Sequence, residues 1–248
     1  MMSIEKSLRI FFNRFFLHQH PETALRYLPI VSVMAKKGLK DSKLLEVGSG
    51  SLGITPYLKR PIDGIDVNFS GPQTELVNKI KGSAVGLPMH RNSYDVVFSS
   101  DTLEHIETNQ RERSIYEMLR VAKKLVIIVV PTGKPSEIQD QKLDRYFRKV
   151  FNKSDKYLTE HVQFGLPQTD EILVSIDKSL RQLDKKARIS SRPLLNLVVR
   201  DILMRTWISK NKYAYYLYLK GYLLLLPLLR ILNFGNCYRR MFVIELAS

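Results

Sequence analysis

The chain has 248 residues, 44% of them hydrophobic, so it can bury a substantial core as one large domain or two small ones. Its single cysteine, Cys237, excludes an intramolecular disulfide and a cysteine-based metal cluster, and fits a reducing compartment such as the cytoplasm. The formal net charge of +15 suits nucleic acid, an anionic membrane surface or an acidic substrate, but residues 41–110 are mildly acidic and both flanks are basic.

The first 22 residues, MMSIEKSLRIFFNRFFLHQHPE, place apolar pairs between Lys6, Arg9 and Arg14. They lack the uninterrupted apolar core and the small-residue cleavage site of a signal peptide, and they favour an amphipathic basic helix. Two interpretations stay open. The helix packs on its own domain with its basic side chains in water, or it binds a membrane surface.

Hydrophobic periodicity predicts the later elements in chain order. The expected helices are residues 23–38, 72–80 (PQTELVNKI), 112–124 and 169–186, the last with Thr169 or Asp170 as its cap. A further helix is expected to start within residues 53–60, and a turn followed by a helix is expected after residue 100. The expected strands are residues 43–48, 62–68, 93–100, 125–131, 187–196 and a last one in 237–248.

Strands that alternate with helices from residue 40 to residue 131 argue for a parallel sheet built from right-handed crossovers. In such sheets, ligands bind beyond the carboxyl ends of the strands. The turns that follow these strands are therefore where we expect function.

The turn after the first of these strands is rich in glycine, in the stretch LLEVGSGSLG. Gly48, Gly50 and Gly53 have the spacing of a dinucleotide-binding fingerprint, which is a weak signal alone. Two carboxylates strengthen it. Glu46 precedes the turn, and Asp66 ends the next strand, where it is placed to accept hydrogen bonds from two ribose hydroxyls.

With these motifs in view, the chain resembles the class I S-adenosylmethionine-dependent methyltransferases. The resemblance covers residues 23–135 and resumes at the C-terminus. It is carried by LLEVGSGSLG, GIDVN, GSAVGLP, YDVVFSSDTLEHI, MLRVAKKLVIIVVP and CYRRMFVIEL. It implies an α/β fold, a Rossmann-like three-layer sandwich with a seven-stranded, mostly parallel sheet, and S-adenosylmethionine as the cofactor.

The resemblance also implies a role for each matching residue. Glu46 would reach the methionine part of the cofactor, directly or through water, and Asp66 would hold the ribose. The other implied cofactor contacts are Gly48, Ser49, Gly50 and Gly53 at the turn, Val67, Ser83 and Ala84 around the adenine, and Ser99 or Ser100 under the cofactor at the end of the strand at 93–100.

Methyl transfer from a sulfonium is an in-line displacement, so the enzyme chiefly aligns nucleophile, methyl carbon and sulfur. A hydroxyl acceptor must also lose a proton, and we expect His105, with Asp101, to supply the catalytic base. Glu104 and His161 are expected to contact the substrate, His161 from a lid before the helix at 169–186.

No metal is expected, although one alternative stays open. Asp101, Glu104 and His105 could converge on a divalent ion if they share one face of a helix turn. Quinone-biosynthetic O-methyltransferases are similar here, with an acid, two intervening residues and Glu-His, and some bind a divalent metal through this motif. The same motif is common in the family without any metal.

The stretch 213–232 is rich in Leu and Tyr and about as long as a membrane span, but Lys220, Gly221, Pro227 and Arg230 interrupt it. We interpret residues 195–235 as a helical, apolar cover of the active-site mouth. It is flanked by basic residues that would face an anionic bilayer: Arg200, Arg205, Lys210, Lys212, Arg239 and Arg240. Helices packed on the sheet, or a homodimer interface, are the alternatives.

The predicted organisation is therefore residues 1–40 as a helical segment packing on the core and residues 41–248 as the methyltransferase domain. The expected activity is methyl transfer to a small-molecule or lipid-linked acceptor, at oxygen, in the cytoplasm and with peripheral membrane association as an option. A nucleic-acid methyltransferase and a non-catalytic, membrane-associated cofactor-binding protein are the alternatives. The sequence shows no appended RNA-binding module that would favour the first of them.

Overall fold

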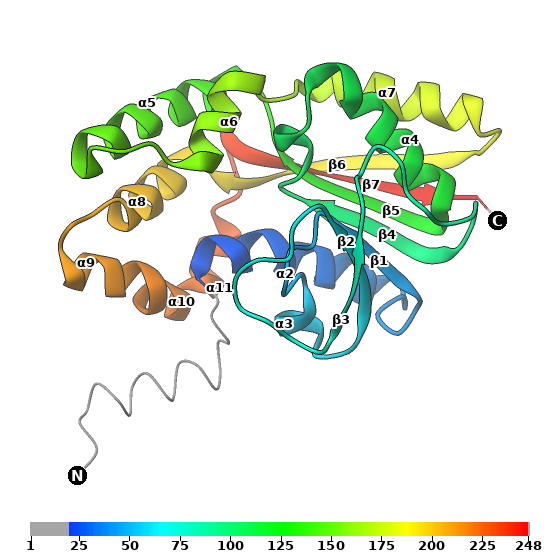
Figure 1. Ribbon diagram of the computed structural model, residues 1–248, viewed down its shortest axis with the longest axis horizontal. Helices are drawn as coiled ribbons and strands as arrows, with labels where there is room; N and C mark the ends of the chain where they lie inside the picture. The colour runs from blue at the N-terminus through cyan, green and yellow to red at the C-terminus, as the bar shows by residue number, and fades with distance from the viewer. Residues whose placement is uncertain (1–19, 248) are drawn as a thin grey trace, which may run out of the picture.

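A seven-stranded sheet with helices on both faces forms the centre of the molecule (Figure 1). The computed structural model describes residues 20–247, so the prediction for the first 19 residues lies outside the described part. The strands are β1 (Leu44–Val47), β2 (Ile62–Asp66), β3 (Val77–Lys81), β4 (Tyr94–Ser100), β5 (Ala122–Pro131), β6 (Ala187–Asn196) and β7 (Cys237–Leu246).

The strand order is β3-β2-β1-β4-β5-β7-β6, and neighbours pair in parallel except β7, which is antiparallel to both β5 and β6. This confirms the predicted α/β fold with a mostly parallel sheet. From Leu125 onward β5 is an unbroken apolar run, because side chains on both of its faces are buried there.

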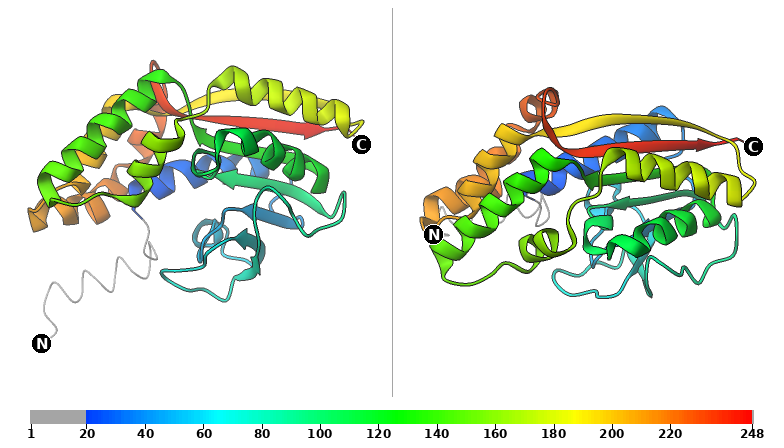
Figure 2. Two further views of the ribbon diagram at one scale, coloured as in Figure 1. Left: turned by 45° about the horizontal axis from the view of Figure 1, so that its top comes forward. Right: turned by 90° about the horizontal axis from the view of Figure 1, so that it is seen from above.

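The helices fall into two groups. Those that cover the sheet are α2 (Pro21–Lys36), α3 (Thr55–Leu58), α4 (Arg111–Val121) and α7 (Thr169–Gln182). Those beyond the carboxyl ends of the parallel strands are α5 (Lys134–Phe151), α6 (Lys156–Phe164), α8 (Leu197–Trp207), α9 (Lys212–Tyr216), α10 (Tyr222–Leu224) and α11 (Leu226–Ile231) (Figures 1 and 2).

The two faces of the sheet have separate hydrophobic cores. α4 and α7 pack on one face, where Met118 and Ile176 meet inward-facing residues such as Val126. α2 and α3 pack on the other face, where Ile30 and Ile54 join a second cluster. The alternation of the strand side chains between these two layers builds the expected three-layer sandwich.

The helical insertion lies between β6 and β7, and its helices α8 to α11 fall within the range 195–235. It has a core of its own, in which Leu203 and Tyr218 pack against Leu25 of α2 and Tyr238 of β7. Within residues 20–247, no helix is long and apolar enough to cross a membrane.

One predicted helix and one predicted helix cap are wrong in this part of the fold. Residues 72–80 do not form a helix: β3 begins at Val77 and pairs in parallel with β2, with Val77 beside Ile62. Edge position explains the error, because β3 has only one strand neighbour and leaves Asn78 and Lys79 exposed, so its sequence lacks the apolar signature of a central strand. The N-cap of α7 is Gln168, which forms a reciprocal capping box with Glu171, rather than Thr169 or Asp170.

Glu46 ties three elements together under the glycine turn. Its side chain is fully buried, and it accepts hydrogen bonds from the Tyr27 hydroxyl of α2 at 2.7 Å and from the backbone N–H of Ile54 at 2.8 Å. Gly53 has φ +52°, and a Cβ there would lie 2.3 Å from a Glu46 carboxylate oxygen, so only glycine fits. Burial raises the pKa of Glu46 to about 7, against the pull of these two donors.

We expect this buried acid to make stability depend on pH. The folded pKa, about 7, is above the ordinary value of 4.5, so folding takes up a proton between these two values. Stability should therefore fall by up to about 3 kcal/mol as pH rises from 4.5 to 7. Urea unfolding at several pH values, compared with Glu46→Gln, measures this. An identical pH dependence in the two proteins would contradict it.

Candidate active site

The turn after β1 is shaped by contacts that leave no room for a side chain. Gly48 has φ +76°, and a Cβ there would lie 2.2 Å from the Thr102 hydroxyl oxygen. The N–H groups of Gly48 and Ser49 donate to the carbonyl of Ile65 at 2.8 and 3.3 Å, which fixes the turn against β2. Gly50 lies on the open side of the turn, where a Cβ would meet no atom within 4 Å, and the backbone there lines a cavity.

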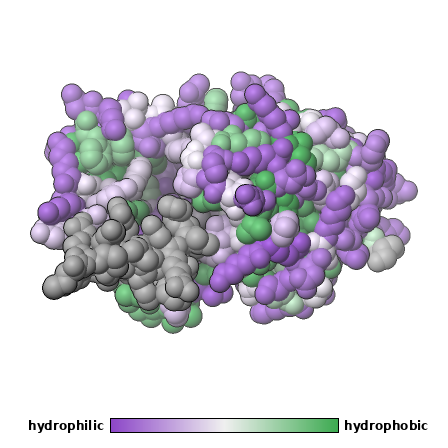
Figure 3. Space-filling view, turned by 60° about the horizontal axis from the view of Figure 1, so that its bottom comes forward, coloured by the Kyte–Doolittle hydropathy of each residue, from purple (hydrophilic) through white to green (hydrophobic). Residues whose placement is uncertain are grey.

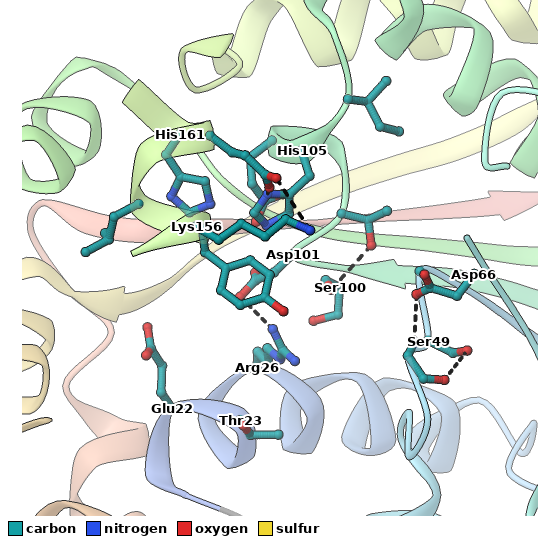
Figure 4. A pocket seen from close by; sticks show the side chains of 18 of the residues that line it. Glu22, Thr23, Arg26, Ser49, Asp66, Ser100, Asp101, His105, Lys156 and His161 are labelled. Atoms are coloured by element: carbon teal, nitrogen blue, oxygen red, sulfur yellow. Dashed lines mark hydrogen bonds and ion pairs between the residues drawn. The ribbon is translucent and has the colours of Figure 1, made fainter. Parts of the chain in front are cut away.

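Asp66, at the end of β2, lies beside the glycine turn. One of its carboxylate oxygens accepts from the backbone N–H of Gly50 at 2.8 Å and the other from that of Asn68 at 2.9 Å. Figure 4 shows Ser49 and Asp66 side by side at one end of a pocket. The carboxylate thus orients the glycine turn and stays within reach of a ligand's hydroxyl groups.

A cavity of about 930 Å³ starts here and runs past the end of β4 to the helical insertion. That volume is at the upper end of small-molecule sites, enough for a nucleoside cofactor and a second ligand. Eight of the predicted cofactor residues line it: Gly48, Ser49, Gly50, Asp66, Val67, Ser83, Ala84 and Ser100.

Three other predicted cofactor residues, Glu46, Gly53 and Ser99, are not among the lining residues. Glu46 and Gly53 support the turn from below, and the side chain of Ser99 is 1% exposed. A contact between Glu46 and the cofactor therefore stays a prediction, and the structure favours an indirect one.

Asp101 does not match the expected role of a base. Its backbone has φ +51°, and its carboxylate accepts from Arg239 at 2.7 and 2.9 Å and from Arg26 at 3.0 Å. Burial would raise the pKa of Asp101, but Arg239 and Arg26 outweigh it and hold that pKa well below its usual range. A carboxylate so stabilised as an anion is a poor proton acceptor.

The segment after Asp101 forms a short 3₁₀ turn, η1 (Leu103–His105), instead of the expected α-helix. The left-handed backbone of Asp101 breaks the chain direction before this turn. As a result, the carboxylate of Asp101 joins the arginines, and it does not share a face with Glu104 and His105. The predicted triplet of ligands is therefore not formed as a set.

His105 and His161 lie against each other, with ring centroids 4.8 Å apart (Figure 4). Nδ1 of His105 is 2.8 Å from a carboxylate oxygen of Glu160, and Nδ1 of His161 is 2.8 Å from one of Asp140. Burial, together with the charge of His161, lowers the pKa of His105 to about 4. Burial would also lower the pKa of His161, but its hydrogen bond to the carboxylate of Asp140 and the charge of that carboxylate outweigh burial and raise the pKa.

Glu104 lies beside these rings with a fully buried side chain. Neither of its carboxylate oxygens has a hydrogen-bond partner from another residue within the described part of the chain. Burial and the charge of Asp101 raise the pKa of Glu104 to about 8. The structure therefore brings together His105, Glu104 and His161, three of the predicted catalytic or substrate-contacting residues. It sets apart the fourth, Asp101, which was predicted to act with His105.

Buried charges that the sequence analysis misplaced or missed complete this end of the cavity. Arg200 and Arg239 were expected to face a bilayer, but they are 2% and 4% exposed. Arg200 pairs with Asp140 at 2.7 Å, and Arg239 with Glu22 at 3.1 Å. No local pattern marks these residues, because their partners come from elements far apart in the sequence.

Comparison with known proteins identifies a methyltransferase domain in the chain. Residues 45–130 match the family model described as "Methyltransferase domain". A search of curated proteins finds no matching sequence.

Solved structures show the same fold at low identity. A SAM-dependent methyltransferase of Thermotoga maritima, described as a possible histamine N-methyltransferase, has a TM-score of 0.55 and 16% identity, with 99% of each chain covered. A putative methyltransferase from an antibiotic biosynthesis pathway of Anabaena variabilis has a TM-score of 0.53 and 15% identity, covering 89% of this chain and 98% of that one. These likenesses concern the fold.

The matched family model spans β1 to β5, which are the strands whose carboxyl ends build the glycine turn, the Asp66 side and the segment from Ser100 to His105 along the cavity. Sequence match, strand order and site geometry thus agree on the activity and on the cofactor. Residues 45–130 form a methyltransferase domain, and the chain is an S-adenosylmethionine-dependent methyltransferase.

Proposed function

We propose that this methyltransferase acts on a small-molecule or lipid-linked acceptor, at an oxygen atom. The observation that carries the proposal is that one continuous cavity joins the proposed cofactor end, built by the turns after β1 and β2, to the helical insertion. At its other end, apolar and aromatic side chains of the insertion lie beside the paired charges described above: Met204, Trp207, Tyr215, Tyr218 and Leu219. Such a lining favours an apolar or amphiphilic acceptor.

In this assignment, the end of the cavity near Gly48 and Asp66 binds the nucleoside part of the cofactor. The methyl group then faces the region between Ser100 and the histidines, since these residues line the middle of the same cavity. Transfer needs the acceptor atom in line with the methyl carbon and the sulfur, and fixing this geometry supplies much of the rate.

The predicted base, His105, lies on the acceptor side, where Glu160 orients its ring. Its lowered pKa keeps the imidazole uncharged at neutral pH, so a lone pair is available. The same low pKa makes it a weaker proton acceptor than a histidine that titrates near pH 7. Oxygen is proposed as the accepting atom because polar, uncharged groups of this kind can hold a hydroxyl.

A peripheral contact with an anionic membrane is the second part of the proposal. The helices α9 to α11 and the residues after them expose large apolar side chains, including Tyr213, Leu224, Leu228, Ile231 and Phe234, each at least half exposed. Figure 3 shows hydrophobic surface at its lower left, beside the residues drawn in grey. Exposed Lys210, Lys212 and Arg230 accompany this surface and complement anionic lipid.

The cofactor end is tested by Asp66→Ala, which removes the acceptor proposed for the ribose hydroxyls. Loss of one or two hydrogen bonds to a carboxylate should weaken S-adenosylmethionine binding about 10- to 100-fold, as measured by calorimetry. Asp63→Asn is the matched control: Asp63 is on the same strand but bonds Asn78 and Tyr94, away from the cavity. Equal affinity in wild type and Asp66→Ala would exclude this role.

The acceptor class is tested with labelled S-adenosylmethionine and three pools: phenols and alcohols of low mass, a total lipid extract, and RNA. We expect label in the organic-extractable fraction, released by conditions that cleave methyl ethers. Asp66→Ala should transfer far less. Label confined to RNA would replace the proposed acceptor with nucleic acid, the alternative that the net charge left open.

Membrane contact is tested by flotation with vesicles. The wild-type protein should float with anionic vesicles and less with neutral ones, and salt should weaken the contact because it screens surface charge. Leu224→Glu combined with Leu228→Glu should reduce flotation several-fold. Val174→Glu on α7 is the control, since that side chain is equally exposed but lies elsewhere. Flotation that is unchanged in the double variant would rule out this surface.

A further inference from the structure

Three potential ligand atoms meet at one point of the cavity wall. Glu104 and His105 come from η1 and His161 comes from α6, and one donor atom of each lies within 4.8 Å of the others. All three residues line the cavity, between Ser100 and the insertion. Figure 4 shows the two imidazole rings together on this side of the pocket.

The carboxylate of Glu104 is the strongest sign that something else binds here. It is fully buried, and both its oxygens lack a hydrogen-bond partner from another residue within residues 20–247. Leaving a buried carboxyl group unsatisfied costs several kcal/mol, so folded proteins rarely tolerate it without a ligand or an ion. Nε2 of His161 is buried and unpartnered in the same part of the chain.

The two rings are already oriented as ligands. Each uses Nδ1 to contact a carboxylate at 2.8 Å, His105 with Glu160 and His161 with Asp140. A carboxylate that accepts from Nδ1 leaves the lone pair on Nε2, and this pairing is the usual support of a metal-bound histidine. The hydrogen bonds therefore assign Nε2 of both rings as the free donors.

The carboxylate that orients His161 is itself held by other side chains. Asp140 also accepts from the Tyr238 hydroxyl at 2.8 Å and pairs with Arg200 at 2.7 Å. Elements α5, α8 and β7 thus hold one imidazole in place. Such rigid support is what a metal site requires and what a substrate-contacting histidine in a mobile lid lacks.

We propose that Glu104, His105 and His161 bind one divalent cation of the first transition row. A donor set of two imidazoles and one carboxylate favours Mn²⁺, Fe²⁺, Co²⁺ or Zn²⁺ over Mg²⁺ and Ca²⁺, which prefer oxygen. The donor atoms lie within 4.8 Å of one another, whereas ligands of one ion lie roughly 3–3.5 Å apart, so the widest separation needs to close by up to about 1.5 Å. Asp101 is not a ligand, because Arg239 and Arg26 occupy it.

Three protein ligands leave coordination positions open toward the cavity, which is the arrangement of catalytic rather than structural sites. A cation there supplies Lewis acidity, which lowers the pKa of a hydroxyl group that coordinates it. This extension rests on the proposed oxygen acceptor, and it changes the role of His105 from proton acceptor to ligand. Glu160 and Asp140 become positioning residues.

The proposal is tested by titrating chelator-treated protein with Mn²⁺ and following the paramagnetic resonance signal of the free ion. We expect one ion per chain in the wild type, and binding weakened at least 100-fold in His161→Ala and in Glu104→Gln. His90→Ala is the matched control, an exposed histidine outside the cluster that should bind as the wild type does. Glu160→Gln should weaken binding about 10- to 100-fold through His105.

Thermal unfolding gives a second readout, because an ion bound only to the folded state raises its melting temperature. Mn²⁺ should raise the melting temperature of wild type and His90→Ala but not of Glu104→Gln. Retained S-adenosylmethionine binding by calorimetry shows that a variant is folded, and if His161→Ala fails this check, the conservative Glu104→Gln decides.

Two results would overturn the site: no Mn²⁺ bound by the wild type at 1 mM, or equal binding in the wild type and a folded Glu104→Gln. The titration contains neither cofactor nor acceptor. A negative result therefore leaves the proposed acceptor untouched, whereas transfer of label only to RNA would overturn that acceptor without removing the ion.

Discussion

The contact between Asp101 and Arg239 holds the functional end of the molecule together. Asp101 follows β4 and Arg239 lies in β7, which are not neighbours in the sheet because β5 separates them. Arg26 of α2 joins the same carboxylate, and Arg239 also pairs with Glu22. A buried charge is tolerated only when it is paired, so these ion pairs dictate how α2, β4 and β7 meet at the carboxyl edge of the sheet.

The network continues through Tyr238 into the acceptor side of the cavity. The guanidinium of Arg200 lies 3.3 Å from the centre of the Tyr238 ring, and Arg200 pairs with Asp140, which in turn orients His161. The helical insertion is thereby connected to the residues that line the reaction space. This continuity gives the insertion a part in building the acceptor end, beyond covering it.

The same network reduces the positive charge that is available to bind a polyanion at the surface. Three arginines of the basic total, Arg26, Arg200 and Arg239, are paired with acids around the cavity instead of attracting polyanions from outside. The charge that remains accessible near the insertion comes from lysines and arginines beside exposed Leu and Tyr side chains. Such a mixture of apolar and basic groups suits a lipid surface better than a nucleic-acid groove.

The sequence by itself determined the α/β class, the glycine turn and the cofactor, because these depend on short, contiguous motifs. Only the tertiary structure decided that residues 77–81 form an edge strand, since pairing with β2 outweighed the weak local pattern. It likewise decided that Asp101 is paired with two arginines and that His161, instead of Asp101, lies beside Glu104 and His105. The physical reason is the same in each case: pairing partners from distant segments decide these roles, and sequence spacing does not reveal which distant segments will meet.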